Sequence, residues 1–329
     1  MHAIILVGGR GTRLQPLTDS RPKPMLPIID VPFLEHQLRH LKAHGVTAVT
    51  FACGFLPNQI VGYFGEGARV GMQLTYVVEP EPLDTAGAIA FAARTLDPQR
   101  LLVCNGDVLT DLDVGLLVRE HERMGATATI ALTPVDDPTR YGLVRCDAAT
   151  NAVLAFLEKP TLEEAGDDRY INAGTYVLEP EVIAMVPEGV RCNIEREIFP
   201  ALVGKRLYAI GFRGYWNDIG TFPSYLAANV DMLQGVFGPG GHDGNRYIAP
   251  DAVVAADATV GWGAVIGPKA VVESGAHVVN SVVLEHARIG VGARLDGVIV
   301  GEHGVVEDGA QPESGSVVSP GVPGGLAPA

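Results

Sequence analysis

Short apolar runs alternate with helical patterns over residues 1–235. Several runs are rich in branched or bulky residues and are typical of buried strands: HAIILV from residue 2, TAVTFAC from residue 47, QLTYVV from residue 73 and RLLVCNGD from residue 100. Between them, VPFLEHQLRHLKAHG, TAGAIAFAARTL and VGLLVREHERMG indicate helices. Strands that alternate with helices predict a Rossmann-like α/β domain with a mostly parallel sheet, which binds ligands at the carboxyl ends of its strands.

The pattern changes between residues 126 and 215. TATIALTPV, YGLVRCD, AVLAFLEK and YINAGTYVL are strand-like and are joined by short polar connections. We interpret them as additional strands that build the other wall of a cleft.

Beyond residue 246 the chain is periodic. Small residues recur every six positions from Ala252 to Ala276, and an aliphatic residue stands four positions before each of them. The period then becomes 17, with Ala276, Ala293 and Ala310 in register. A hexapeptide period predicts a short left-handed parallel β-helix of about four coils. Its exposed coil ends need a cover, which either the first domain or another subunit could supply, and we expect a homo-oligomer.

The predicted organisation is an α/β domain over residues 1–235, a Gly-rich linker over 236–246 and a β-helix over 247–329 that ends in a flexible C-terminal tail.

Composition excludes several classes of protein. With 47% hydrophobic and 19% charged residues, the chain is a folded protein, and its net charge of -14 argues against a nucleic-acid partner. The cysteines are far apart and form no CxxC pair, so we expect neither a zinc site nor disulfides. We expect a cytoplasmic protein with no membrane segment, because neither a secretion signal nor an apolar run of membrane length is evident.

The opening motif LVGGRGTRLQPLT carries the first candidate chemistry. A Walker loop is absent, and a dinucleotide fingerprint fails because Leu14 stands at the third glycine position. What remains is a set of glycines whose backbone can approach an anion closely. Arg13 adds a fork of donors that matches phosphate oxygens, and Lys23 in RPKPMLPI adds a second cation. The motif therefore predicts a phosphate site.

Several motifs together resemble one family. LVGGRGTRLQPLT and RPKPMLP, followed in order by EPEPLDTAGA, NGDVL, FLEKP, INAG and WNDIG, resemble the sugar-1-phosphate nucleotidyltransferases. The resemblance covers nearly the whole chain, and within the family it is greatest to bacterial mannose-1-phosphate guanylyltransferases with a C-terminal hexapeptide β-helix. It implies that residues 1–235 form a catalytic domain, which joins a nucleoside triphosphate to a sugar 1-phosphate and releases pyrophosphate.

The resemblance also implies roles for particular residues. Arg13, Lys23 and Asp107 would be catalytic, and Asp107 and Asp218 would bind Mg²⁺, a cation that prefers carboxylate and phosphate oxygens. The implied nucleotide-binding residues lie in the opening motif and around LDTAG: Leu6, Gly8, Gly9, Gly11, Thr12, Arg13, Glu79, Thr85 and Gly87.

The implied sugar-phosphate contacts lie in the middle of the chain: Gly142, Glu158, Lys159, Asn172 and Gly174. Glu195 also matches a family position, although on a helix a glutamate there is equally expected on a solvated face. We expect no general base, because a sugar phosphate with a second pKa of about 6 is already largely ionised at neutral pH. Catalysis would consist of aligning the two substrates and neutralising the negative charge that develops on the phosphates.

The substrates stay open at this point. Glu79 could accept hydrogen bonds from guanine, which favours GTP, and mannose 1-phosphate is the expected acceptor. However, Asp84 in LDTAG replaces the glycine common in guanylyltransferases, so UTP or dTTP remains an alternative. Glucose 1-phosphate, a heptose phosphate or a cyclitol phosphate is equally compatible with the sugar-side residues.

Two other classes of function are alternatives. Hexapeptide β-helices also form acyltransferases, and His277, His286 and His303 lie in the tail, where we expect them at exposed corners. A catalytically silent regulatory homologue is the second alternative. The presence of Arg13, Lys23 and both candidate metal ligands favours an active enzyme.

Overall fold

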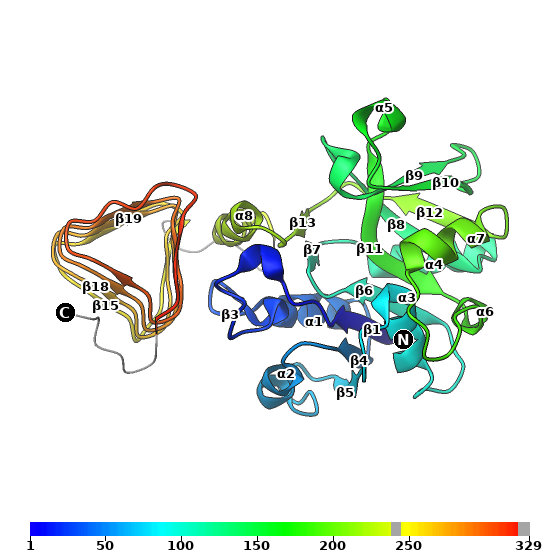
Figure 1. The fold of residues 1–329 in the computed structure, drawn as a ribbon, viewed down its shortest axis with the longest axis horizontal. Coiled ribbons are helices and arrows are strands. Elements are labelled where there is room, and N and C mark those ends of the chain that lie inside the picture. The colour runs from blue at the N-terminus through cyan, green and yellow to red at the C-terminus, as the bar shows by residue number, and fades with distance from the viewer. Residues whose placement is uncertain (238–244, 322–329) are drawn as a thin grey trace. The chain divides into compact units, whose positions relative to one another are not determined.

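The computed structural model describes residues 1–237 and 245–321, which form two compact units (Figure 1). The first unit comprises Met1–Arg10 and Gln37–Trp216, and the second comprises Gly11–His36 and the chain from Asn217 onward. Most of the predicted linker and the predicted flexible tail fall on residues 238–244 and 322–329, outside the described residues. The domain boundaries therefore stay a prediction.

The first unit is built on one sheet, in which the strands from the start of the chain are parallel to one another. Its strands run in the order β10-β9-β11-β6-β1-β4-β5, and β8 and β12 extend it from β11. The predicted strands at the start of the chain are confirmed as β1 (His2–Val7), β4 (Ala48–Cys53), β5 (Gln73–Val78) and β6 (Leu101–Asn105). β1 lies between β4 and β6 and is parallel to both, so these strands end at the same edge of the sheet.

The strands of the middle region join this same sheet. They are β8 (Ala128–Pro134), β9 (Gly142–Cys146), β10 (Val153–Glu158), β11 (Tyr170–Leu178) and β12 (Leu207–Gly211). The first four of these match the predicted strands. Since β11 pairs antiparallel with β6, these strands continue the sheet that contains the parallel strands.

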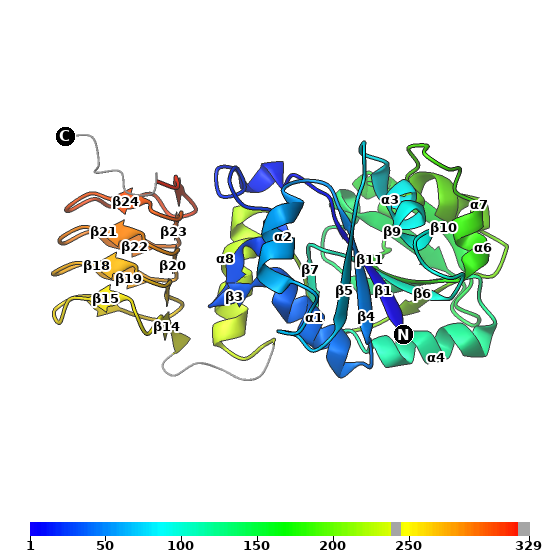
Figure 2. The same ribbon diagram turned by 90° about the horizontal axis from the view of Figure 1, so that it is seen from below.

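Helices cover both faces of the parallel strands, as predicted. α1 (Phe33–Ala43), α3 (Asp84–Ala93) and α4 (Val114–Met124) correspond to the predicted helices, and α2 (Pro57–Phe64) and α8 (Phe222–Leu233) were not predicted. Figure 2 shows α2 and α3 on opposite sides of β4 and β1. α3 packs on β1 and β4 through small buried residues such as Ala86 and Ala90, so this helix lies close to the sheet.

The remaining elements of the α/β part are short. They are α5 (Leu162–Ala165), α6 (Pro180–Ala184), α7 (Phe199–Leu202), β2 (Pro27–Ile28), β3 (Val31–Pro32), β7 (Val108–Thr110), β13 (Trp216–Asp218), the 3-10 turns η1 (Thr12–Leu14), η2 (Lys23–Met25) and η3 (Pro138–Arg140), and the π-helical turn η4 (Ile194–Ile198). Within the described ranges, no helix combines the length and apolar character that crossing a membrane requires.

The predicted parallel β-helix is confirmed in the second unit. Its coils outline a triangle in Figure 1 and are seen stacked from the side in Figure 2. Each side of the triangle is a parallel sheet, with the orders β14-β17-β20-β23-β25, β15-β18-β21-β24 and β16-β19-β22. The bounds are β14 (Tyr247–Ile248), β15 (Val253–Val254), β16 (Thr259–Val260), β17 (Val265–Ile266), β18 (Val271–Val272), β19 (His277–Val279), β20 (Val282–Val283), β21 (Arg288–Ile289), β22 (Arg294–Asp296), β23 (Ile299–Val300), β24 (Val305–Val306) and β25 (Val317–Val318).

The change of period in the sequence has a structural cause. Tyr247 pairs with Val265 one coil further on, and Val265 pairs in turn with Val282, so the second coil is shorter than the first by a single residue. The missing residue falls at the corner before Val282, where Ser281 is fully buried. The Ser281 hydroxyl donates to the Val279 carbonyl at 2.6 Å and accepts from the Val298 amide at 3.1 Å. A side chain thus satisfies backbone groups at the shortened corner.

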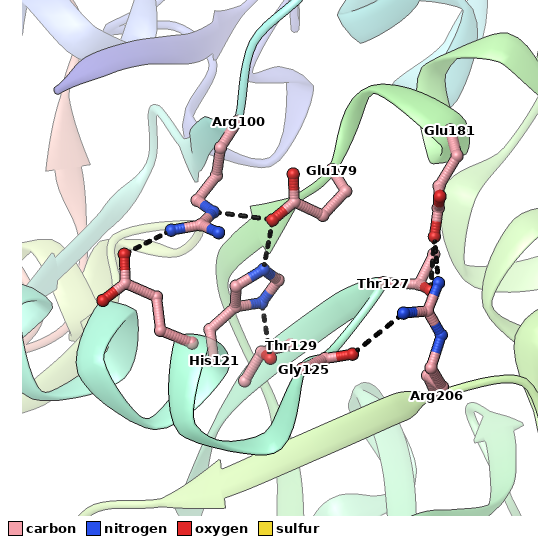
Figure 3. A network of polar contacts seen from close by, with 9 residues as sticks. Arg100, His121, Gly125, Thr127, Thr129, Glu179, Glu181 and Arg206 are labelled. Carbon is pink, nitrogen blue, oxygen red and sulfur yellow. Dashed lines mark hydrogen bonds and ion pairs between the residues drawn. The ribbon is translucent and has the colours of Figure 1, made fainter.

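A buried histidine ties α4 to the sheet of the first unit (Figure 3). His121 Nδ1 lies 2.8 Å from Thr129 Oγ1, and its Nε2 lies 3.1 Å from Glu179 Oε1. Because a carboxylate only accepts, a neutral ring that donates from Nε2 satisfies both contacts. Arg100 donates to the same Glu179 oxygen at 2.7 Å and to Glu122 at 2.5 Å. Although burial opposes it, hydrogen bonds from His121 and Arg100 keep the pKa of Glu179 below its ordinary value.

This network predicts that the protein loses stability in mild acid. Burial lowers the pKa of His121, so between its ordinary value of 6.5 and its lowered value the unfolded chain binds more protons than the folded one. Unfolding therefore becomes easier as the pH falls below about 6.5. His121→Gln cannot titrate, and we expect its thermal midpoint to fall less than that of the wild type between pH 7 and pH 5. An equal or larger fall in the variant would contradict this assignment.

Candidate functional site

Glycines bring the ends of the parallel strands of the first unit close together. The Gly106 amide donates to the Leu6 carbonyl at 2.9 Å, and a Cβ on Gly106 would lie 2.5 Å from that oxygen. A Cβ on Gly54 would lie 2.7 Å from the Gly8 carbonyl oxygen. No side chain fits at these contacts, so the backbones of neighbouring strand ends touch directly at this edge of the sheet.

The next glycine of the motif borders open space. A Cβ on Gly9 would meet no atom within 4 Å, so a ligand can approach its backbone. Arg10, the first arginine of the motif, lies over the Phe55 ring with 5.7 Å between the guanidinium carbon and the ring centroid. A ring of the protein thus already contacts this cation.

In the second unit, Gly11 turns the chain. Its φ of 64° is the left-handed conformation that favours glycine, and a Cβ there would lie 3.0 Å from the Lys23 Cβ. The Thr18 hydroxyl donates to the Gly11 carbonyl at 2.9 Å. Thr12 and Arg13, both exposed, then enter η1, which the fully buried Leu14 anchors. The turn therefore projects Arg13 outward.

A carboxylate lies beside both predicted cations. Asp218 Oδ2 is 3.8 Å from Arg13 Nη2, and Asp218 Oδ1 is 3.4 Å from Lys23 Nζ. The Arg13 side chain is 58% exposed, whereas that of Lys23 is only 9% exposed. A Cβ on Gly220 would lie 2.5 Å from Arg13 Nη2, so glycine leaves room for the guanidinium. The structure thus brings together residues from three separate motifs.

Asp107 lies two residues after the end of β6 and directly before β7 in the first unit. It therefore stands after a parallel strand of the sheet, as its motif suggested. Its pairing with Asp218 at a metal site stays a prediction.

Glu79 follows β5 and extends toward the opening motif. Its Oε2 accepts a hydrogen bond from the Leu83 amide at 2.8 Å, and its Oε1 lies 3.7 Å from where a Cβ on Gly8 would stand. Burial raises the pKa of Glu79. One carboxylate oxygen is thus fixed by the chain, and the other lies at the glycine motif.

Asp84 has a local role that explains the departure from glycine. Its φ is 62°, a left-handed conformation in which glycine is favoured and aspartate is tolerated. Asp84 Oδ1 accepts from the Thr85 amide at 2.8 Å and from Asn193 Nδ2 at 2.9 Å, and Oδ2 lies 3.4 Å from Arg191 Nε. Donors of the chain itself contact both oxygens, which accounts for an aspartate here without a contact to the nucleobase.

Thr85 and Gly87 face the segment 190–195. The Thr85 hydroxyl donates to Glu195 Oε2 at 2.9 Å. The Gly87 amide donates to the Cys192 carbonyl at 3.1 Å, and a Cβ on Gly87 would lie 3.0 Å from the Val190 carbonyl oxygen. These contacts give both residues a packing task, and their role in nucleotide binding stays a prediction.

On the sugar side, Gly142 and Glu158 face each other across β9 and β10. A Cβ on Gly142 would lie 2.6 Å from the Phe156 ring, so the glycine is required by packing as well as by any ligand. Lys159 Nζ is 3.7 Å from Glu158 Oε1, and the lysine side chain is 60% exposed. Its ammonium group is thus accessible to a phosphate.

Asn172 and Gly174 lie on β11 where its register with β8 shifts between Asn172 and Tyr176. Such irregularities re-aim side chains and are common near active sites. Gly174 has a φ of 74°, and a Cβ there would lie 2.7 Å from the Asn105 side chain. The Gly174 amide donates to Asn172 Oδ1 at 2.9 Å, which fixes the orientation of the Asn172 amide.

The structure decides between the two interpretations of Glu195. It lies on the π-helical turn η4, half-buried, and its carboxylate accepts from the Thr85 hydroxyl at 2.9 Å and from the Tyr176 hydroxyl at 3.3 Å. The solvated-face alternative is therefore wrong. Tyr176 was not predicted, although Asn172, Gly174 and Tyr176 occupy alternate positions of one strand and this spacing was a usable signal.

The fold and these clusters define an α/β protein with a polar site at the carboxyl ends of its parallel strands and with paired cations that suit a polyphosphate. The sequence matches the nucleotidyl transferase family over residues 2–235 and the GMPPB C-terminal domain over residues 242–323. The chain therefore belongs to the nucleotidyl transferase family.

Named relatives extend over nearly the whole chain. It is 38% identical to a mannose-1-phosphate guanylyltransferase of Mycobacterium tuberculosis, over 97% of this chain and 83% of that protein. It is 33% identical to mannose-1-phosphate guanylyltransferase 1 of Arabidopsis thaliana, over 97% of this chain and 91% of that protein. Among solved structures, it is similar to HddC from Yersinia pseudotuberculosis complexed with GMP-PN, at 28% identity and a TM-score of 0.60, over 70% of this chain and 99% of that one.

The two arginines of the opening motif should differ in importance. Arg13 is exposed beside Asp218, whereas Arg10 rests on a ring. We expect Arg13→Ala to slow pyrophosphate release by about two to three orders of magnitude, as for other lost charge-stabilising donors, with the fold intact by circular dichroism. Arg10→Ala is the matched control, and its rate of pyrophosphate release should fall only a few-fold. A near-normal rate in Arg13→Ala would remove this residue from the site.

The half-buried Glu195 should make stability fall as the pH rises. Burial is the main cause that raises its pKa above the ordinary value of 4.5, and the neighbouring Glu158 adds to it. Above pH 4.5 the unfolded chain releases this proton before the folded one does, so the free energy of unfolding decreases until the raised pKa is passed. We expect the thermal midpoint of Glu195→Gln, relative to that of the wild type, to increase as the pH rises from about 4.5 to 7. If the midpoint of the variant minus that of the wild type stays constant or decreases over this range, the raised pKa of Glu195 is contradicted.

Proposed function

We propose that this chain transfers a guanylyl group from GTP to mannose 1-phosphate and releases pyrophosphate, forming GDP-mannose. The observation that carries the proposal is the cluster of Arg13, Lys23 and Asp218, in which cations from two motifs lie beside one carboxylate. Such an arrangement suits a triphosphate held together with a divalent metal. The nucleotidyl transferase family match gives this chemistry its reaction class.

The reaction needs no general base from the protein. The phosphate oxygen of the sugar substrate attacks the α-phosphorus of the nucleotide, and the bond from that phosphorus to the bridging oxygen of pyrophosphate breaks. Arg13 and Lys23 would stabilise the charge that develops on the departing pyrophosphate. Lys159 is accessible beside Glu158 and would hold the attacking sugar phosphate. Alignment and charge neutralisation then account for catalysis.

Asp107 and Asp218 are the residues proposed to hold the metal. Their carboxylates are the hard oxygen donors that Mg²⁺ prefers, and two carboxylates with substrate phosphates are its usual environment in such enzymes. When bound, the ion would neutralise negative charge on the triphosphate. Because Asp218 also lies near Arg13 and Lys23, its carboxylate would orient the cations and the metal toward the same substrate group.

Guanine is favoured by two arguments. Glu79 has one carboxylate oxygen fixed by Leu83 and the other at the glycine motif, and a carboxylate can accept from guanine N1-H and its amino group. Asp84, the residue that suggested UTP, is occupied by donors of the chain. The names of the M. tuberculosis and A. thaliana relatives support GTP and mannose 1-phosphate.

Two further features belong to the proposal. The four cysteines are free thiols, which supports a cytoplasmic location. Homo-oligomer formation through the β-helix is supported by its first coil, where the inward aliphatic Ile248 is 37% exposed.

The decisive test is a matrix of GTP, ATP, UTP, CTP and dTTP against mannose 1-phosphate, glucose 1-phosphate and a heptose 1-phosphate, following pyrophosphate. We expect the highest kcat/KM for GTP with mannose 1-phosphate. Arg13→Ala serves as the control for contaminating activity. A higher kcat/KM for UTP with glucose 1-phosphate would replace the proposed substrates while keeping the reaction class.

A further inference from the structure

The hydroxyl of Thr85 contacts the segment that carries Glu195 in two ways. It donates to Glu195 Oε2 at 2.9 Å and accepts from the Ile194 amide at 2.9 Å. The hydroxyl has a single proton, so while it is bonded to Glu195 it cannot donate to a nucleotide. The resemblance assigned Thr85 to the nucleotide, but its side-chain contacts point to a different substrate.

A chain of hydrogen bonds runs from this hydroxyl to the sugar side of the site. The Gly174 amide can only donate, so Asn172 Oδ1 accepts from it and Asn172 Nδ2 donates to the Tyr176 oxygen at 2.7 Å. The Tyr176 proton is then directed to Glu195 Oε1 at 3.3 Å. Every bond in the chain therefore has a fixed direction, and Glu195 receives a proton donor on each oxygen.

The surroundings of Glu195 make this arrangement sensitive. Tyr176 is fully buried, so its ring cannot be repositioned without disturbing the core. A half-buried carboxylate that loses one of its side-chain donors turns toward a new one or takes up a proton. Either change would disturb a pocket that depends on the orientation of Asn172 and Glu195.

We propose that Thr85 is a positioning residue for the sugar 1-phosphate pocket, acting through Glu195, rather than a contact of the nucleotide. This inference rests on the proposed function in taking Asn172 and Glu195 as neighbours of the sugar. A residue within the LDTAG motif is thereby assigned to the side of the site that binds the sugar 1-phosphate, which is the acceptor of the reaction.

Other contacts keep the segment in place when the hydroxyl is removed. Asp84 accepts from Asn193, and the Cys192 carbonyl accepts from the amides of Ala86 and Gly87 at 3.0 and 3.1 Å. Thr85→Val is nearly isosteric and leaves all of these contacts intact. The substitution therefore tests the orientation of Glu195 without detaching η4 from α3.

The experiment compares steady-state constants of Thr85→Val, Thr85→Ser and the wild type. Thr85→Val loses the bond to Glu195 and the bond from the Ile194 amide. We expect it to raise the KM for sugar 1-phosphate at least about tenfold, the ratio for loss of one hydrogen bond to a charged group. Its KM for the triphosphate should stay within about twofold, and Thr85→Ser, which keeps the hydroxyl, should restore wild-type values. Tyr176→Phe removes the other donor to Glu195 and should show the same split between the two KM values.

Thr95→Val is the matched control, because the Thr95 hydroxyl donates only to the Ala92 carbonyl at the other end of α3. It should leave both KM values unchanged, and thermal midpoints confirm that each variant is folded. A rise in the KM for the triphosphate alone, or unchanged KM values in Thr85→Val, would overturn the inference. The constants are measured with whichever substrate pair the wild type prefers, so failure of the proposed substrates is seen separately in the wild type.

Discussion

The carboxylate of Glu195 imposes the main constraint on the candidate site. A half-buried carboxylate is stable only with donors on its oxygens, and here Thr85 and Tyr176 supply them from a helix and from a strand. This requirement ties α3, β11 and η4 into one assembly. The LDTAG motif and the INAG motif are therefore parts of a single hydrogen-bonded unit, although they lie far apart along the chain.

Much of the fold could be predicted because its elements follow simple periods. The runs around Ile4 and Leu102 are continuous and apolar since the parallel strands are buried on both faces. The β-helix could be predicted from the regular spacing of alanines such as Ala264 and Ala270, which are buried at its corners. The single sheet of the first unit could not be predicted, because the antiparallel pairing of β11 with β6 depends on contacts between strands distant in sequence.

The site was predictable where residue type alone limits the chemistry. Arg13, Lys23 and Asp218 are charged residues in distinctive motifs, and the structure brings them together. Glu195 was ambiguous because a glutamate on a helix is usually solvated, and the π-helical geometry that turns it inward has no simple sequence pattern. Tyr176 was missed because a tyrosine in a strand is most simply a core residue, which it also is.

The left-handed backbone at Asp84 has a consequence for substitutions at this position. Glycine and aspartate both tolerate a φ of 62°, but only aspartate adds hydrogen bonds with Thr85 and Asn193. The aspartate at this position in the motif therefore reports a bend in the main chain together with local hydrogen bonds of the chain itself. A glycine there would keep the bend and lose those hydrogen bonds, so a change at this position alters first how the start of α3 is held.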